Sequence, residues 1–593
     1  MNQLSAPLAT ALDHHQAGRL ADAESGYREI LEDRPDHVDA LHYLGVLMHQ
    51  RGDNAQAAQL LDRALGLALD AAACWSNRGL VAAALGDLPY AVECYERALA
   101  IDPAFSNARN NLGVSLQRLG RFDESIEQYK TLLARDPDFL DARLNLGSAY
   151  AAAKRYEDAL AARREVLVRD PHNFDAHFGE ANALRELKRF DESVASLHRA
   201  LALRPNHFEA RVNLGTTLGL FGKFVEAEAE YRQALTLRDD PQIHVCVGAA
   251  IGSQGRFEEE EPHYRRALEL APDHADAQHN LALLHLRRGQ FKEGWALHEV
   301  RWRSSKYKAI EIPGVPEWRG ESLQGRTLLL VGEQGHGDMM QFARYARVLA
   351  QMGATVDMWV PENIVELIQS VHGIRRALTR GPTAEYDYWT PSMSVPHHVA
   401  GLMPGVLADT PYMSVSEKRI GEWPARVKKL AGGRRKIGIV WAGSPTFGND
   451  QFRSMPFAAW SPFADVANTE WFSLQKGVAR DQLLNAECAL KPHDLTDDIH
   501  DFADTAALIQ QLDLVITVDT SVAHLAGALG KPVWVFLPAN YDWRWMLDRD
   551  DSPWYPGMRL FKQATLGDWT APVAQAKAAL MAGPIGRSSS PTA

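Results

Sequence analysis

Residues 104–137 read AFSNARNNLGVSLQRLGRFDESIEQYKTLLARDP, a 34-residue unit whose features recur along the first half of the chain. One glycine of the unit belongs to a series at intervals of 34 residues, Gly45, Gly79, Gly113 and Gly147, which Gly215 and Gly248 continue. A second series keeps the same frame: Gly18, Gly52, Gly86, Gly120, Gly222, Gly255 and Gly289. A one-residue deletion near Asp239 shifts both series together, so the chain carries an internal repeat.

The residue pattern of each unit predicts a pair of packed helices. A small residue in the first glycine series lets the first helix approach the second, and the second glycine closes the turn between them. Prolines end most units, at Pro35, Pro103, Pro137, Pro171, Pro205 and Pro272. The period and pattern resemble tetratricopeptide repeats. We expect about nine units between residues 4 and 303, stacked as an α-solenoid with a concave groove for an extended partner.

Asparagine recurs two residues before the glycine of the first series. These positions are Asn77, Asn111, Asn145, Asn213 and Asn280. The first helix of each unit lines the concave face, so the amides are expected to form a ladder that holds a peptide backbone through its donors and acceptors. This arrangement resembles protein O-GlcNAc transferase, which joins such repeats to a glycosyltransferase and uses an asparagine ladder in that way. The alternative is that asparagine is simply common at this repeat position.

The pattern changes from helical to mixed in the second half of the chain. From Thr327, short apolar runs alternate with helical segments, which is the signature of βαβ units. Residues 327–331 (TLLLV) predict a buried strand, followed by the glycine-rich segment 332–338 (GEQGHGD) and a helix from Met339 to about Gln351. Glycines at such a junction turn a helix N-terminus toward a ligand.

A second set of strands predicts a second lobe. Residues 436–441 (KIGIVW), 513–519 (DLVITVD) and 532–537 (PVWVFL) have the composition of buried strands. In open parallel sheets, ligands bind at the carboxyl ends of strands, and Ser444 and Asp519 fall at such ends. The predicted organisation is a repeat array at 1–303, a linker at 304–326, an acceptor-side lobe at 327–415, a donor-binding lobe at 416–581 and a disordered tail at 582–593.

Two segments resemble the bacterial heptosyltransferase family. Residues 519–532 (DTSVAHLAGALGKP) are similar to its donor-site segment, and Gly337-Asp338 resembles a Gly-Asp pair whose aspartate is the catalytic base in that family. The resemblance covers roughly residues 327–563. It implies a two-lobed, Rossmann-like fold of the GT-B type and sugar transfer from a nucleotide-sugar donor to a hydroxyl, with inversion.

The resemblance and the placement of the residues suggest roles for the first three candidates. We interpret Asp338 as the general base that deprotonates the acceptor hydroxyl. The alternative is an ordinary helix N-cap, a position that aspartate favours. Ser444 and Arg453 are candidates for binding the leaving phosphate, with a surface ion pair as the alternative for Arg453.

The remaining candidates follow the strand that ends at Asp519. Asp519 is a candidate for accepting a hydrogen bond from a sugar or ribose hydroxyl, and Thr520 and Ser521 for binding phosphate oxygens beside a helix N-terminus. All three residues alternatively serve only to cap that helix. His524, one turn into the helix, either faces the site or packs in the interior. The aromatic cluster around Trp543 predicts a packed C-terminal seam.

Composition indicates in which cellular compartment the protein works and which classes of ligand it does not bind. The formal net charge of −12 argues against a general nucleic-acid binder. Four widely spaced cysteines suit a reducing compartment, and no signal peptide or membrane-spanning run is evident, so we expect a cytoplasmic protein. The acidic run at residues 548–551 follows the aromatic cluster rather than a nucleotide-domain strand. We therefore expect no metal cofactor, with a helix dipole and an arginine replacing the cation.

Three functions follow from these observations. The first is transfer of a sugar to Ser or Thr of a protein that the repeats bind. Bacterial flagellin-modifying enzymes, which pair such repeats with a heptosyltransferase-like domain, are similar, and this resemblance implies flagellin as acceptor and a nonulosonic acid as the sugar. The second is a glycan or lipopolysaccharide-type transferase recruited by its repeats. The third is a non-catalytic adaptor with a degenerate transferase domain.

Overall fold

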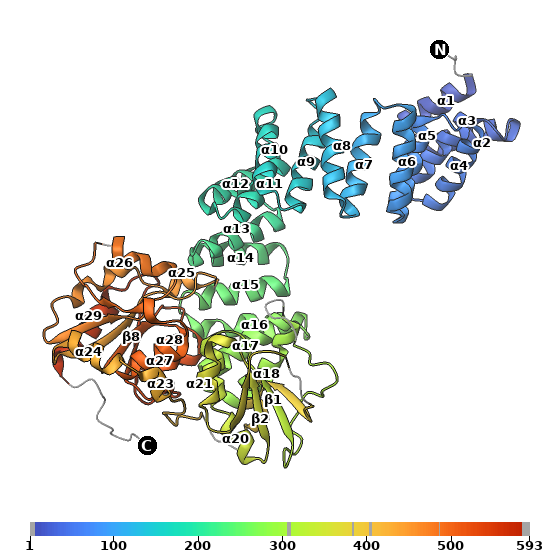
Figure 1. The fold of residues 1–593 in the computed structure, drawn as a ribbon. Coiled ribbons are helices and arrows are strands. Elements are labelled where there is room, and N and C mark those ends of the chain that lie inside the picture. The colour runs from blue at the N-terminus through green and yellow to red at the C-terminus, as the bar shows by residue number, and fades with distance from the viewer. Residues whose placement is uncertain are drawn as a thin grey trace. The chain divides into compact units, whose positions relative to one another are not determined.

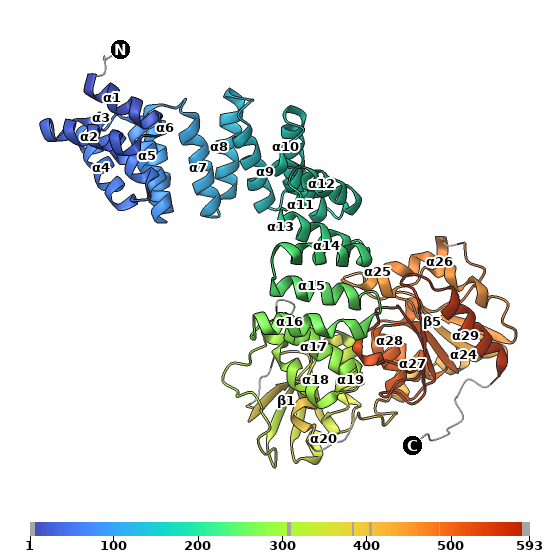
Figure 2. The same ribbon diagram turned by 180° about the vertical axis from the view of Figure 1, so that it is seen from behind.

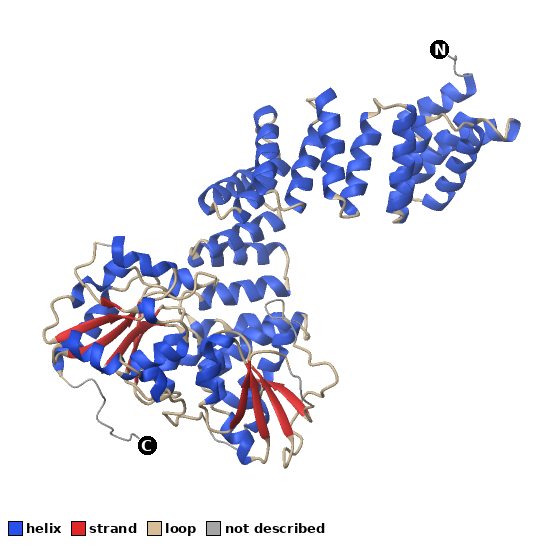
Figure 3. Cartoon of the chain, in the orientation of Figure 1, coloured by secondary structure: helices blue, strands red, loops and turns tan. Residues whose placement is uncertain are grey.

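The computed structural model describes residues 6–304, 310–381, 385–401, 406–446, 448–485 and 487–583. The chain forms two compact units, Met1–Leu237 and Arg238–Ala593. Repeat helices are followed by two parallel sheets, which appear as two groups of red strands in Figure 3, so the predicted fold class is confirmed. Most of the tail predicted to be disordered, residues 584–593, lies outside the described residues.

The first unit consists of helical hairpins stacked in chain order, coloured blue to green in Figure 1. Its helices are α1 (Ala6–Gln16), α2 (Leu20–Asp33), α3 (Val38–Gln50), α4 (Asn54–Leu67), α5 (Ala72–Leu85), α6 (Leu88–Ile101), α7 (Ser106–Arg118), α8 (Phe122–Arg135), α9 (Leu140–Ala152), α10 (Tyr156–Arg169), α11 (Phe174–Glu186), α12 (Phe190–Leu203), α13 (Phe208–Leu220) and α14 (Phe224–Leu237).

The two glycine series have the roles that the sequence predicts. A Cβ atom on Gly113 would lie 2.5 Å from the Tyr129 ring, so only glycine allows the first helix of that hairpin to approach the second. The second series ends the first helix: Gly86 is the C-cap of α5 with φ of 87°. Where this glycine is replaced, Lys154 and Lys188 take the same left-handed conformation, with φ of 59° and 58°.

The second unit begins with the last two helical hairpins and continues into the sheets. The hairpins comprise α15 (Pro241–Gly252), the 3₁₀ turn η1 (Phe257–Glu259), α16 (Glu261–Leu270), α17 (Ala275–Arg287), α18 (Phe291–His298) and the 3₁₀ turn η2 (Glu299–Arg303). Trp295 of α18 is buried against Phe342 and Trp543, with ring centroids 5.7 and 5.3 Å apart. These repeat helices therefore share a core with the α/β region. Figure 2 shows α17 and α18 lying beside α19 (His336–Ala343).

The first lobe is a four-stranded parallel sheet in the order β3-β2-β1-β4. Part of the predicted linker extends its edge, because Trp318 N–H donates to the Trp389 carbonyl at 2.8 Å. The elements are β1 (Thr327–Val331), α19 (His336–Ala343), α20 (Ala346–Gln351), β2 (Thr355–Trp359), η3 (Glu362–Ile364), α21 (Val365–Gln369), β3 (Ile374–Leu378), β4 (Tyr388–Pro391) and α22 (Val395–Val399).

The second lobe is a six-stranded parallel sheet in the order β10-β9-β8-β5-β6-β7. Its strands are β5 (Arg435–Val440), β6 (Thr469–Ser473), β7 (His493–Asp494), β8 (Leu514–Val518), β9 (Val533–Leu537) and β10 (Met558–Lys562). Its helices and turns are α23 (Glu417–Ile420), α24 (Trp423–Ala431), α25 (Asp450–Arg453), η4 (Phe457–Phe463), η5 (Val478–Asp481), α26 (Gln482–Asn485), η6 (Thr496–Asp498), α27 (Phe502–Gln510), α28 (Ser521–Ala528), η7 (Trp543–Trp545) and α29 (Thr570–Ala582).

One predicted helix differs from the structure. The sequence predicts a single helix from Met339 to about Gln351, but α19 already begins at His336, and a break after Ala343 separates it from α20. The early start follows from Asp338, whose carboxylate accepts the Gly335 N–H at 2.9 Å and so stabilises the first turn. Asp338 is therefore the third residue of α19 and not its N-cap.

Candidate active site

A cavity of about 1410 Å³ is lined by both lobes of the second unit. Much of its lining follows the carboxyl ends of strands β1, β5, β6, β8 and β9. The order of the second sheet reverses between β8 and β5, and the segments after these two strands carry most of the predicted residues. The cavity therefore lies where open parallel sheets bind ligands.

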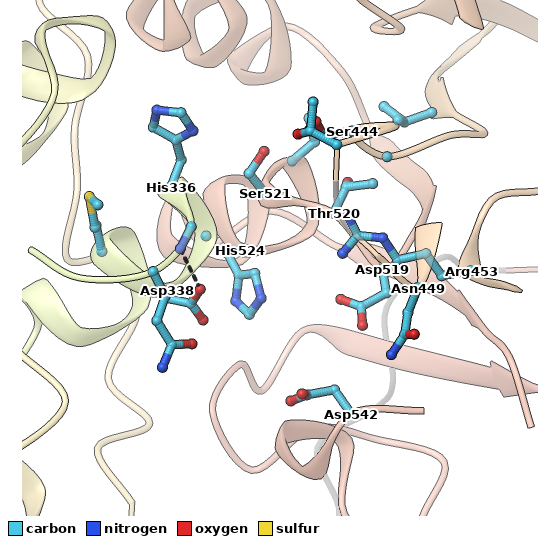
Figure 4. A pocket seen from close by; sticks show the side chains of 18 of the residues that line it. His336, Asp338, Ser444, Asn449, Arg453, Asp519, Thr520, Ser521, His524 and Asp542 are labelled. Atoms are coloured by element: carbon cyan, nitrogen blue, oxygen red, sulfur yellow. Dashed lines mark hydrogen bonds between the residues drawn. The ribbon is translucent and has the colours of Figure 1, made fainter. Parts of the chain in front are cut away.

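All seven candidate residues of the α/β region line this cavity. They are Asp338, Ser444, Arg453, Asp519, Thr520, Ser521 and His524. Figure 4 shows His524 between Asp338, which comes from the first lobe, and Asp519, which comes from the second. The structure thus brings together residues that are up to 186 positions apart in the sequence, Asp338 and His524.

Asp338 is held at both carboxylate oxygens. One oxygen accepts the Gly335 N–H at 2.9 Å, and the other forms an ion pair with Arg544. Burial raises the pKa of Asp338, and the positive charge of Arg544 opposes that rise. Each oxygen keeps a further lone pair, so the carboxylate remains able to accept a proton from a hydroxyl in the cavity.

Arg544 is a site residue that the sequence analysis missed. Besides Asp338, it donates to Asp542 at 2.7 Å and to the Gln341 side chain at 3.1 Å, and its guanidinium lies 4.4 Å from the centre of the Trp543 ring. The sequence analysis interpreted the segment around Trp543 as a packed aromatic seam and assigned Arg544 no role in the site. The available signal was the charge itself, because an arginine placed between two buried tryptophans requires an anionic partner.

The N-terminus of α28 carries no side-chain cap. Thr520 is its N-cap, but the Thr520 hydroxyl lies 3.0 Å from the Thr517 hydroxyl and makes no capping hydrogen bond. A capping hydrogen bond is therefore not present at Thr520, and donor binding by residues 519–521 stays a prediction. The first N–H groups of α28 are left to the cavity, in the arrangement that binds phosphate in many proteins.

Asp519 is a carboxyl group at the end of β8. Burial and the neighbouring Asp542 raise its pKa to about 6, and Arg453 acts in the opposite direction. Arg453 pairs with Asp450 at 3.1 Å, so an ion pair exists, yet Arg453 also lines the cavity. A Cβ atom on Gly443 would lie 2.7 Å from the Arg453 guanidinium, so glycine lets this side chain lie against the backbone after β5.

Ser444 lies after β5 in the same part of the cavity. Its hydroxyl is 2.8 Å from the Thr446 hydroxyl and is solvent-exposed. The backbone before it is fixed by Gln475, whose side-chain oxygen accepts the N–H groups of Trp441 and Ala442 at 3.0 and 2.8 Å. Gln475 is a second residue that the sequence analysis missed.

His524 lines the cavity and is also packed. Its Nδ1 lies 3.0 Å from the Tyr555 hydroxyl, and its ring stacks on Trp545 with centroids 5.5 Å apart. Burial lowers the pKa of His524 to about 3, so the imidazole is neutral near pH 7. A Cβ atom on Gly337 would lie 2.7 Å from the His524 ring, so this pair sets how closely α19 and α28 approach.

The asparagine series is half-buried along the repeats. The Asn145 amide donates to the Asn110 side chain at 3.1 Å, Asn213 donates to Asn182 at 2.9 Å, and the Asn77 amide nitrogen lies 2.7 Å from His42 Nε2. Successive repeats are thus joined by side-chain hydrogen bonds near this register. Asn111 and Asn280 are half-buried at the same repeat position.

The described residues show neither a metal cluster nor a membrane-spanning helix. None of their His, Cys, Asp and Glu side chains gather in a group of three or more able to hold a metal ion. Within the same part of the chain, no helix combines the length and apolar character needed to span a bilayer. Metal-independent catalysis stays a prediction.

Family comparisons agree with both halves of the chain. Tetratricopeptide-repeat profiles match residues 14–77, 72–105, 110–174, 178–242 and 252–294. The profile of glycosyltransferase family 9 (heptosyltransferase) matches residues 473–536. This second match contains Asp519 and His524 but not Asp338, Ser444 or Arg453.

Individual relatives share only parts of the chain. Protein FlbA of Caulobacter vibrioides is 26% identical over 337 residues, which are 52% of this chain and 55% of FlbA, so the chain spans about half the length of the curated relative it matches. A tetratricopeptide repeat protein from Parabacteroides merdae is 15% identical, with a TM-score of 0.34 over 41% of this chain and 97% of its own. MamA is 21% identical, with a TM-score of 0.27 over 28% of this chain and 96% of its own. The chain therefore carries tetratricopeptide repeats and, within its α/β region, a segment that matches the heptosyltransferase family.

Proposed function

We propose that the protein transfers a sugar from a nucleotide-sugar donor to a Ser or Thr hydroxyl of a protein such as flagellin, with inversion, in the cytoplasm and without a metal ion. The observation that carries this proposal is the pairing, in one cavity, of an uncapped helix N-terminus with a half-buried carboxylate from the other lobe. These are the two elements that an in-line displacement at an anomeric carbon requires.

In the proposed reaction, the first lobe supplies the base and the second lobe binds the leaving phosphate. Asp338 takes the proton of the acceptor hydroxyl, and the oxygen forms a bond to the anomeric carbon. The bond between that carbon and the leaving phosphate oxygen breaks, and the electron pair stays on the phosphate. The dipole of α28, Ser521 and Arg453 stabilise the negative charge that develops there, and Ser444 donates from the loop after β5.

The repeats support a protein as the acceptor. Amide side chains recur at one register of the array, and those of Asn145 and Asn213 each make one side-chain hydrogen bond along it. An amide has two N–H donors and one carbonyl acceptor, so capacity is left for a peptide backbone. Flagellin enters the proposal through the resemblance to flagellin-modifying enzymes.

Intact-mass analysis tests the proposal. The chain is co-produced with candidate acceptor proteins, flagellin first, in cells that make the nucleotide-sugar donors of the organism from which the chain comes. We expect a glycan mass on the acceptor that disappears with Asp338→Asn and persists with Asp568→Asn, an exposed aspartate outside the cavity. A modified glycan with no protein adduct would instead support the glycan-building alternative, and no product at all would support the adaptor.

A further inference from the structure

The cavity is larger than a nucleotide-sugar donor needs. Small-ligand pockets commonly measure about 300–1,000 Å³, and this cavity measures about 1410 Å³. The predicted donor residues lie after β5 and β8. A separate part of the lining comes from the end of the repeat array and from the segment just before β1, and none of the roles proposed above uses it.

That part of the lining is apolar. Leu283 of α17, Trp302 of η2 and Ile310 contribute side chains that are only half-buried, so each leaves hydrocarbon or ring surface facing the cavity. We call these three residues the apolar wall. Half-buried apolar side chains that line a ligand cavity offer a surface that an apolar group can cover.

A buried arginine lies against the Trp302 ring. The Arg301 guanidinium lies 4.3 Å from the centre of the Trp302 ring and covers one face of it. Arg301 is itself fully buried, with two hydrogen bonds of 3.0 Å to Glu333 and one of 2.7 Å to Ser394. Glu333 belongs to the loop between β1 and α19, and Asp338 lies in the first turn of α19. The wall is therefore tied to the loop that leads into the helix of the candidate base.

The charged groups in this part of the lining are already paired. Arg287 donates to Glu260 at 3.0 Å and lies 4.0 Å from the centre of the Phe257 ring. Glu333 also accepts the Met393 N–H at 2.8 Å, and burial keeps the pKa of His298 well below its ordinary value, so His298 is neutral. A carbohydrate acceptor needs several donors and acceptors for its hydroxyls, whereas an apolar side chain needs none.

We infer that the apolar wall binds an apolar side chain of the acceptor polypeptide next to the modified Ser or Thr. This inference rests on the proposed function and deepens it, because it makes the last repeat a part of the acceptor site. The repeats then contribute to the choice of the modified residue in addition to recruiting the acceptor.

The test compares two peptides from the acceptor protein that the mass measurement identifies. One peptide keeps the native residues around the modified hydroxyl, and in the other the apolar neighbours are replaced by serine. We expect the wild type to prefer the native peptide by about tenfold or more in kcat/KM, as burial of one apolar side chain allows. Trp302→Ala and Leu283→Ser should abolish this preference, and Trp302→Phe should retain most of it.

Controls separate this inference from the proposed function. Arg303→Ala changes an exposed neighbour of Trp302 outside the cavity lining and should leave the preference intact. Titration with ADP, GDP, UDP and CDP should give the same affinities for Trp302→Ala and wild type. Three results would overturn the inference alone. The peptide preference could survive in Trp302→Ala and Leu283→Ser, the wild type could use an oligosaccharide acceptor equally well, or Trp302→Ala could lose nucleotide binding. A wild type that modifies no protein overturns the proposed function and this inference together.

Discussion

Arg544 of the second lobe forms an ion pair with Asp338 of the first, so a residue 206 positions further along the chain fixes the candidate base. Arg544 also holds Asp542, and the same segment is attached to the last repeat, because the Leu547 N–H donates to the Arg287 carbonyl at 3.1 Å. The geometry at the base therefore depends on both lobes and on the end of the repeat array.

Replacing Arg544 by Met should shift the pH dependence of transfer. Burial raises the pKa of Asp338 and Arg544 opposes that rise, so losing the arginine raises the pKa further. A base acts only in its deprotonated form, so the acid limb of kcat/KM should move to higher pH, and it should move less with Arg544→Lys. The measurement is the transfer rate between about pH 5 and 9.

The control for this variant is Arg549→Met, because Arg549 pairs with Asp551 at 2.6 Å outside the cavity lining. It should leave the acid limb in place. An acid limb that also stays in place in Arg544→Met would show that Asp338 is not the titrating base.

The raised pKa of Asp519 predicts that the stability of the protein falls as the pH rises. Burial and Asp542 raise that pKa to about 6, above the unfolded value of about 3.9. A carboxyl group with a raised folded-state pKa favours folding while it is protonated, and this contribution is lost as the pH rises through about 6. Asp519→Asn stays neutral, so it should unfold at a higher temperature than the wild type at about pH 8, with a smaller difference near pH 4.

Asp568→Asn provides a contrast of opposite sign for the thermal unfolding measurement. Hydrogen bonds from Thr570 lower the pKa of Asp568, so its contribution to stability is present above the unfolded pKa and the Asn variant loses it. If Asp519→Asn is less stable than the wild type at pH 8, Asp519 is not the destabilising charge that its burial implies.

Strands β5, β8 and β9 of the second lobe were predicted from their apolar runs, and every residue of β8 and β9 is buried. Strand β8 was expected at 513–519 and spans Leu514–Val518, in which Thr517 is the one polar residue. Strands β2 and β3 of the first lobe were not predicted, because polar residues interrupt them. Asp357 of β2 is fully buried and pairs with Arg375 and Arg376 of β3, and no apolar pattern reveals such a contact.

The residues of the candidate site also divide into those that strand patterns predict and those that they do not. Ser444 and Asp519 were predictable because each follows a parallel strand, and the carboxyl ends of such strands meet at one edge of the sheet. Arg544 was not predictable in the same way, because its role depends on Asp338 in the other lobe. The packing of two lobes is a tertiary property that strand patterns do not contain.

Gly337→Ala should separate the two helices that meet in the cavity. The added Cβ atom would lie 2.7 Å from His524 and 3.4 Å from the Ser521 backbone, so α19 or α28 must shift. We expect at least a tenfold loss of transfer, roughly the effect of 1.4 kcal/mol, together with a lower unfolding temperature. Gly66→Ala is the control, since its Cβ meets no atom within 4 Å and alanine in a helix gains about 0.5–1 kcal/mol.

Replacing Asn77, Asn111, Asn145 and Asn213 together by Ala should weaken binding of the protein acceptor. If each amide makes one hydrogen bond of about 0.5–1.5 kcal/mol with the acceptor, the KM for that acceptor rises by at least tenfold. The affinity for nucleoside diphosphates should not change. Gln59→Ala removes an exposed amide from the second helix of a repeat and should have no effect. An unchanged acceptor KM in the fourfold variant would contradict the ladder.

Two truncations test where the catalytic part of the chain begins. A fragment of residues 238–593 keeps the second compact unit, including the Arg301–Glu333 pair and the whole cavity lining. A fragment of residues 305–593 starts near the predicted domain boundary but leaves the buried Glu333 carboxylate without its arginine, at a cost of about 3–5 kcal/mol.

We expect the longer fragment to fold and to bind a nucleoside diphosphate, and the shorter one to be insoluble or to unfold at a much lower temperature. Glu333→Gln in the shorter fragment should recover part of the loss, because it removes the unpaired buried charge. If the shorter fragment is as stable as the longer one, the last repeats merely adjoin the catalytic domain. If it is not, they complete its fold, because a charge buried in the loop after β1 has its only described cationic partner, Arg301, in the final turn of the array.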